Sequence, residues 1–150
     1  MSLKMEDASL SEIKDMVARH EGKVNKCYAD SLGKLTFGIG HLVTKDDNID
    51  PNKEYSDDFV YKLFDKDFDK AVEGAARICE GMDLPDKKFG VFISMVFQLG
   101  ESGTSKFKNA LSAARNKEWE LCASELLNSR WHKQTPHRCE ELADIIREEE

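Results

Sequence analysis

The chain has 150 residues, of which 34% are charged and 40% hydrophobic, which is enough to bury one core and is typical of a single domain. Its longest apolar-rich stretch, residues 89–99, is shorter than the roughly 18 residues that a membrane-spanning helix needs, so we expect a soluble protein without membrane insertion. The formal net charge of −7 disfavours general binding to nucleic acid or to anionic membranes.

Three further features restrict the class of protein. Residues 45–69 hold nine acidic residues and four lysines, which together carry −5 of the net charge. The first ten residues contain no apolar run, so no signal peptide is predicted within this chain. Four cysteines are far apart and lack zinc or redox spacing: Cys27, Cys79, Cys122 and Cys139. We expect free thiols in the core; the alternative is one disulfide among the last three, if the protein works outside a cell.

The N-terminal third predicts a helix followed by a small sheet. A capping box at Ser9 opens the helix, and the apolar positions that follow keep helical spacing until the helix ends at Glu21 and Gly22. Residues 24–41 then change to short apolar runs broken by glycine. This pattern predicts an antiparallel hairpin, with a third strand near Leu42.

The rest of the chain predicts helices after one surface loop over residues 46–55. Ser56 is expected to cap a helix of about 20 residues, and residues 86–99 predict a strongly apolar helix that ends at Gly100. Shorter helices are predicted over residues 105–114, 116–127 and 135–147, the last with Thr135 as its cap and Pro136 at its first position. The fold class is therefore α+β, mostly helical, with one small sheet.

Three polar residues at the sheet form a candidate catalytic group. Glu21 ends the first helix, Asp30 lies at the hairpin turn, and Thr36 lies on the returning strand. Two carboxylates in different environments are what glycoside hydrolysis requires, one as proton donor and one as an anion that orients water or stabilises positive charge.

Three blocks, in order, closely resemble the T-even phage lysozymes, glycoside hydrolase family 24. The first block contains His20-Glu21-Gly22, Tyr28-Ala29-Asp30 and residues 36–45 (TFGIGHLVTK); the second is residues 95–103 (MVFQLGESG); the third is residues 129–138 (SRWHKQTPHR). The resemblance implies one lysozyme-like domain over residues 1–150, with a small β lobe (21–58), a connecting helix (56–78), a helical lobe (1–20 and 80–150) and a cleft between the lobes.

The resemblance also implies an activity. It implies an endo-acting lysozyme that hydrolyses the β-1,4 bond between N-acetylmuramic acid and N-acetylglucosamine in bacterial peptidoglycan, with inversion. Glu21 falls on the proton donor, Asp30 on the second carboxylate, and Thr36 on the hydroxyl that helps hold the attacking water. No cofactor and no metal are implied, and we expect a monomer.

Family positions along the saccharide cleft fall on Leu42, Phe97 and Gln98; core packing is the alternative for Leu42 and Phe97. Two other family positions that supply ligand contacts fall on Ala110 and Glu125, so those contacts are not carried over. The loop over residues 46–55 is also shorter than in the T-even phage enzymes, which changes the lower wall of the cleft.

Supporting roles are implied for three more residues. Arg138 falls on an arginine near the catalytic glutamate, and we expect it to fix the rotamer of Glu21. His41 and Asp67 are expected to form a structural pair. A metal site at His132, His137 and Cys139 is disfavoured, because their spacing matches no common site.

Two other functions stay open. A catalytically inactive lysozyme-fold protein that binds cell-wall glycan or a partner is one, and a chitin hydrolase is the other. The sequence does not decide between secretion and release from a host cytoplasm as the route to the bacterial cell wall.

Overall fold

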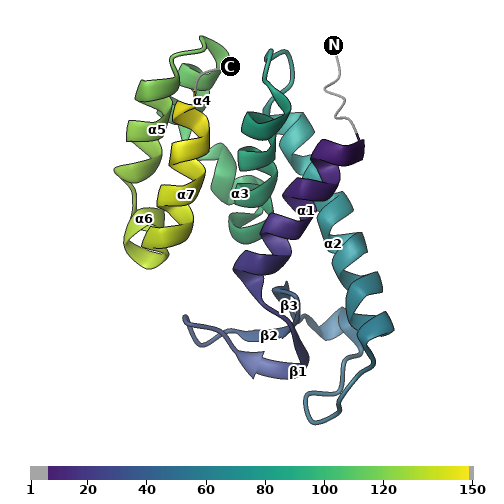
Figure 1. Cartoon of the computed structure of the whole chain (residues 1–150). Coiled ribbons are helices and arrows are strands. Elements are labelled where there is room, and N and C mark those ends of the chain that lie inside the picture. Colours follow the sequence, from purple (N-terminus) through teal and green to yellow (C-terminus); the bar gives the residue numbers. More distant parts are fainter. Residues whose placement is uncertain (1–6, 149–150) are drawn as a thin grey trace. The chain divides into compact units, whose positions relative to one another are not determined.

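The structure is a computed structural model and describes residues 7–148. The elements of this part, shown in Figure 1, are α1 (Asp7–Glu21), β1 (Val24–Ala29), β2 (Leu35–Gly38), β3 (His41–Leu42), a 3₁₀ turn (Lys45–Asp47), α2 (Asp57–Ile78), α3 (Asp86–Ser105), α4 (Lys108–Arg115), α5 (Trp119–Leu127), α6 (Arg130–Gln134) and α7 (Pro136–Arg147). The predicted class, mostly helical α+β with a small antiparallel sheet, is confirmed. None of the helices in residues 7–148 is both long and apolar enough to cross a membrane.

The chain divides into two compact units. The sheet unit is Lys14–Lys70, and the helical unit comprises the described residues up to Ile13 and from Ala71 onward. The sheet unit contains the three strands, in the order β1-β2-β3, each antiparallel to its neighbour (Figure 1). The third strand near Leu42 is therefore confirmed.

One face of the sheet carries the core of its unit. Phe37 is fully buried, and its ring meets the rings of Tyr55 and Phe59 edge-on at 5.2 and 5.8 Å between centroids. Ser56 caps α2 as predicted, because its Oγ accepts a hydrogen bond from the Phe59 backbone N–H at 3.1 Å. Side chains alternate between the two faces of a strand, so Thr36, next to Phe37, points to the opposite face.

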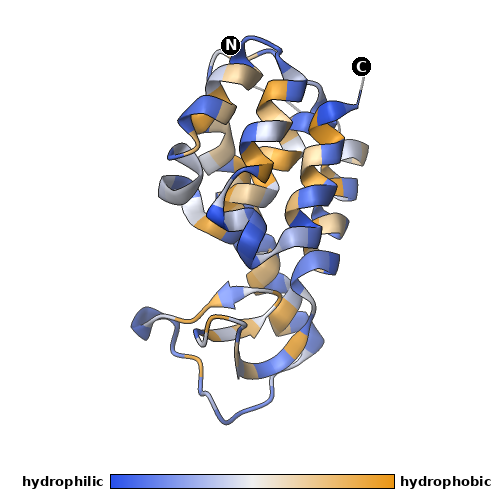
Figure 2. Ribbon diagram, turned by 90° about the vertical axis from the view of Figure 1, so that its left-hand side faces the viewer, coloured by the Kyte–Doolittle hydropathy of each residue, from blue (hydrophilic) through white to orange (hydrophobic). Residues whose placement is uncertain are grey.

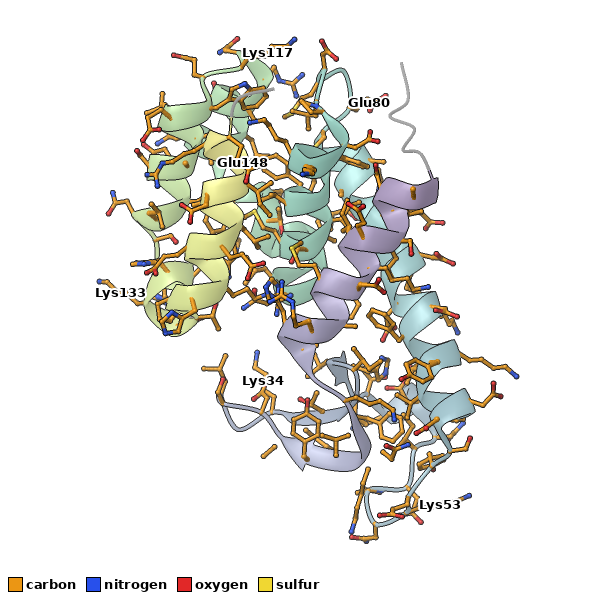
Figure 3. The ribbon with its side chains drawn as sticks, viewed as in Figure 1. Lys34, Lys53, Glu80, Lys117, Lys133 and Glu148 are labelled. Atoms are coloured by element: carbon orange, nitrogen blue, oxygen red, sulfur yellow. The ribbon has the colours of Figure 1, made fainter. Side chains whose placement is uncertain are left out.

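The loop that precedes α2 is mostly hydrophilic in Figure 2. Lys53 extends from it (Figure 3), and its Nζ lies 5.0 Å from the Tyr55 ring centroid. The predicted surface loop over 46–55 is correct for most of its length, although it begins inside the 3₁₀ turn and buries Ile49.

The helical unit is organised around α3, whose residues from Lys88 to Val96 are buried. Figure 2 shows hydrophobic positions concentrated along the inner sides of this bundle. Trp131 is buried, and its ring meets that of Phe107 edge-on at 6.0 Å.

The predicted end of the helix over 86–99 at Gly100 is confirmed, because Gly100 has a non-helical backbone (φ 81°). A second helical segment, included in α3, follows it directly up to Ser105, and the Thr104 hydroxyl donates to the Gly100 carbonyl at 2.8 Å. Two predicted helix starts are wrong, since the helices predicted from residues 105 and 116 begin later, at Lys108 and Trp119.

The start of α7 also differs from the prediction in one respect. Pro136 is at its first position, but the Thr135 side chain does not cap it and instead donates to the Trp131 carbonyl at 3.4 Å. The short helix α6 was not predicted. It is capped by Ser129, whose Oγ accepts a hydrogen bond from the His132 N–H at 3.2 Å.

Candidate active site

Glu21 is the last residue of α1 and is half-buried. The helix ends there because Gly22 adopts a left-handed backbone (φ 72°) while its N–H still donates to the Ala18 carbonyl at 2.9 Å. The Glu21 carboxyl group lies against the backbone of Gly40, where an added Cβ would stand 2.3 Å from Glu21 Oε1. The position of this carboxyl group therefore requires glycine at residue 40.

Asp30 follows β1 directly and is fixed by the hairpin turn. Its Oδ1 accepts hydrogen bonds from the backbone N–H groups of Leu32 at 2.9 Å and Lys34 at 2.8 Å. Gly33 (φ 80°) closes the turn, and Figure 3 shows Lys34 at this hairpin. Both backbone donors bind Oδ1. The other carboxylate oxygen, Oδ2, makes no hydrogen bond within residues 7–148.

Thr36 lies on β2 and is only 5% exposed. Its hydroxyl donates to the Lys34 carbonyl at 3.0 Å. The single hydroxyl proton is thereby used, so the oxygen can offer only lone pairs to a ligand.

Tyr28 is a neighbour of Thr36 on the sheet and is influenced by the charges of Glu21 and Asp30. It is the cross-strand partner of Thr36, so the two side chains share one face of the sheet. Partial burial raises the pKa of the Tyr28 phenol, and the negative charges of Glu21 and Asp30 raise it further. The Tyr28 phenol therefore lies within electrostatic range of both carboxylates, and Thr36 is its neighbour across the sheet. The sequence alone indicates no role for Tyr28, although it lies in the first of the three family blocks.

Leu42 continues the same row on β3. It is the cross-strand partner of Thr36 on the side away from Tyr28. Its side chain is 53% exposed, so core packing, the alternative interpretation, is wrong for this residue.

His41 lies between two carboxylates of the sheet unit. Its Nδ1 is 2.6 Å from Asp67 Oδ2, and its Nε2 is 2.9 Å from Asp47 Oδ2. The hydrogen bond with Asp67 raises the pKa of His41; burial opposes this, and Asp47 adds to it. Burial would raise the pKa of Asp47, but hydrogen bonds from Thr44 and His41 outweigh it and lower that pKa. Asp47 was missed because it lies in the acidic loop segment, where nothing distinguishes it from its neighbours.

Three predicted site residues belong to the helical unit. Gln98 accepts a hydrogen bond from Trp131 Nε1–H at 2.9 Å and donates to Thr135 Oγ1 at 3.1 Å, so its amide orientation is fixed. Arg138 Nη2 lies 3.5 Å from Ser94 Oγ. Phe97 is half-buried. Their participation in the same site stays a prediction.

The described residues contain neither a cluster of metal-binding side chains nor a disulfide. Among residues 7–148, no group of three or more His, Cys, Asp or Glu side chains is arranged to hold a metal ion. His132 Nε2 instead lies 2.7 Å from Glu140 Oε2. All four cysteines are free thiols; Cys79, Cys122 and Cys139 are buried as expected, whereas Cys27 is only half-buried and lies outside the core. Burial raises the pKa of Cys79, Cys122 and Cys139 to about 12.

Comparison with known proteins places the chain in a family. The phage lysozyme family model matches residues 18–149. "Probable T4-type lysozyme 2" and "Probable T4-type lysozyme 1" of Dictyostelium discoideum are 32% and 30% identical to it, over 91% of this chain and 94% of each relative. "Peptidoglycan hydrolase gp36" of Pseudomonas phage phiKMV is 25% identical over 83% of this chain and 14% of that protein. Because the family model extends over most of the chain, including Glu21, Asp30 and Thr36, this protein belongs to the phage lysozyme family.

Proposed function

We propose that the protein is an endo-acting lysozyme that hydrolyses the β-1,4 bond between N-acetylmuramic acid and N-acetylglucosamine in bacterial peptidoglycan. The observation that supports this proposal is that Tyr28 pairs with Thr36 across the sheet while the charges of Glu21 and Asp30 both act on its phenol. The names of its relatives, two T4-type lysozymes and a peptidoglycan hydrolase, agree with this substrate.

Glu21 is the proton donor in this mechanism. Its carboxyl group is held against the Gly40 backbone, which limits the rotamers that it can adopt. A proton donor must meet the glycosidic oxygen from a fixed direction, because the proton is transferred as the bond to that oxygen breaks.

Asp30 and Thr36 hold the attacking water. Thr36 uses its proton on the Lys34 carbonyl, and the backbone of the turn meets only one oxygen of Asp30. Both groups therefore act as acceptors, and a water between them donates one hydrogen to each. One of its two lone pairs is then directed at the anomeric carbon, while Asp30 takes the proton that the water loses. Attack by a water opposite the acid inverts the configuration of the sugar.

Roles for residues outside this group rest on the resemblance and on their local geometry. Leu42 offers an exposed apolar surface beside Thr36 for a sugar face. Gln98 and Phe97 are proposed to bind saccharide, and Arg138 is proposed to orient Glu21. The His41–Asp67 pair holds β3 to α2 and has no part in the chemistry.

The test is clearance of purified peptidoglycan by the native protein, by Glu21→Gln and by Glu12→Gln. Glu12 is an exposed acid on the same helix and serves as the matched control. We expect clearance by the native protein and by Glu12→Gln only, with new reducing ends and the α anomer formed first. Appearance of the β anomer first would contradict inversion. Absence of clearance by all three, with retained binding to peptidoglycan, would establish the inactive glycan-binding protein instead.

A further inference from the structure

The sheet presents one continuous row of side chains on the face opposite its core. Cross-strand pairing places Tyr28 opposite Thr36, and Thr36 opposite Leu42. Directly paired residues in an antiparallel sheet carry neighbouring side chains on the same face. Thr36 is therefore flanked by a phenol ring and an isobutyl group, and it is buried while Leu42 beside it is 53% exposed.

The hydroxyl of Tyr28 is a donor without a protein acceptor. The side chain is half-buried, yet the hydroxyl makes no hydrogen bond within residues 7–148. In the described part of the chain this oxygen is not one of the buried polar atoms that lack a partner, so it is open to solvent and to a ligand. Asp30 lies two positions further along the chain, at the end of the same strand. The unpaired donor is therefore located next to the proposed water-holding group.

The charges around Tyr28 restrict the chemistry of its partner. Glu21 and Asp30 both raise the pKa of the phenol, so it keeps its proton at neutral pH and acts as a donor. Asp30, together with Glu21 whenever it is ionised, repels a second anion. The acceptor that fits is a neutral oxygen, such as a sugar hydroxyl or the carbonyl of an N-acetyl group, and a substrate carboxylate does not fit.

We propose that Tyr28 is a substrate-binding residue, whose hydroxyl donates a hydrogen bond to a neutral oxygen of the sugar bound beside Thr36 and whose ring forms one wall of that position. Leu42 forms the opposite wall. This inference rests on the proposed function for the location of the sugar, and it assigns to Tyr28 a contact that differs from those of Glu21, Asp30 and Thr36.

The experiment separates binding from catalysis. The dissociation constant of an N-acetylglucosamine hexamer is measured for Glu21→Gln, for Glu21→Gln with Tyr28→Phe, and for Glu21→Gln with Tyr61→Phe. Tyr61 is a matched control, because it is 49% exposed on α2 and its ring lies near Lys23. We expect Tyr28→Phe to weaken binding about five- to tenfold, the loss of one hydrogen bond, and Tyr61→Phe to leave it unchanged. Equal affinities for all three proteins would overturn the inference.

A second measurement distinguishes a direct contact of Tyr28 with substrate from an indirect effect of Tyr28 on the carboxyl group of Asp30 or Glu21. In the otherwise native protein, Tyr28→Phe is expected to raise KM and to leave the pH dependence of kcat/KM unchanged. A shift of its acid limb would mean that Tyr28 positions Asp30 or Glu21 instead, and the proposed contact would be wrong. If the native protein cleaves nothing but Tyr28→Phe alone weakens hexamer binding, the proposed hydrolysis fails and the Tyr28 contact stands.

Discussion

The carboxyl group of Glu21 fills the space in which a side chain at Gly40 would have to lie. An added Cβ would be 2.3 Å from Glu21 Oε1 and 2.6 Å from its carboxyl carbon, both far inside contact distance. Gly40 also has a left-handed backbone (φ 68°), which residues with a side chain adopt at a cost. The two residues belong to α1 and to the bend between β2 and β3, so the side chain at the end of the helix packs directly on this bend.

Gly40→Ala is therefore expected to abolish clearance of peptidoglycan, because Glu21 must leave its position. The backbone strain alone should lower the free energy of unfolding by about 1–3 kcal/mol. Gly81→Ala is the control, since Gly81 has a similar φ of 80° but meets only Arg115 Nη1, at an ordinary 3.5 Å. We expect a comparable loss of stability and full activity from Gly81→Ala. Equal activities of the two variants, measured below their unfolding temperatures, would show that Glu21 is not held by this contact.

Thr36→Val is expected to lower kcat about a hundredfold, because the valine keeps the shape of the side chain but removes the oxygen that accepts from the attacking water. Thr36→Ser keeps the hydroxyl and should recover most of the activity. The measurement is the rate of reducing-end release at saturating substrate. Full activity of Thr36→Val together with a loss in Thr36→Ser would instead indicate that the Thr36 methyl group, and not its oxygen, matters.

Asp67→Asn is expected to destabilise the protein in acid more than in alkali. The Asp67 hydrogen bond raises the pKa of His41 above its ordinary 6.5, so the folded protein holds a proton that the unfolded chain releases. This stabilisation is fully present below about pH 6.5 and is lost as the pH rises through the folded value. Urea unfolding at pH 5.5 and at high pH should show a loss of about 1–3 kcal/mol that shrinks at the higher pH.

The control for this pair is Asp58→Asn. Asp58 lies 3.0 Å from Lys62 on the same helix, but both side chains are more than three-quarters exposed, so that ion pair adds little to stability. A pH profile of stability that is the same for Asp67→Asn and Asp58→Asn would refute the role of His41.

Lys88→Met is expected to lower the free energy of unfolding by about 2–3 kcal/mol without loss of activity. Lys88 is 3% exposed, and its Nζ donates to the carbonyls of Ile146 and Glu148 at the end of α7 while it lies 4.6 Å from the Trp119 ring centroid. Methionine fills the space but leaves both carbonyls without this donor.

Lys87→Met is the matched control, since Lys87 is the exposed neighbour on α3. Guanidinium unfolding should give the native value for Lys87→Met. A similar loss in both variants would assign the effect to the methionine or to net charge, and not to the buried hydrogen bonds.

The sheet unit follows closely from its sequence. The turn residues, the glycines and the alternation of side chains all act locally, so the helix end at Glu21 and the three strands are predictable. The carboxyl contact with Gly40 and the row through Tyr28 depend on strand register, which the hydrophobic pattern alone does not define. Asp47 is a further case, because its partner His41 becomes recognisable only once the loop is folded.

The helical unit was harder to predict at its boundaries. Helix α6 has five residues, too few for a periodic pattern, and its start depends on one hydrogen bond to Ser129. Gly100 ends one helical segment as glycine at that position indicates, but the short helical segment that follows it directly was not predicted. A side-chain hydrogen bond, from Thr104 to the Gly100 carbonyl and from the His132 N–H to Ser129, accompanies the start of both short segments.

The buried thiols of the helical unit can be used to measure local unfolding of this unit. Cys79, Cys122 and Cys139 are fully buried, and only the thiolate form of cysteine reacts with alkylating reagents. With pKa values of about 12, these three groups stay protonated as well as shielded at neutral pH. Each thiol reacts only after the residues around it unfold locally. The alkylation rate at each cysteine, measured by mass spectrometry, therefore reports how often that part of the bundle unfolds, and no engineered label is needed.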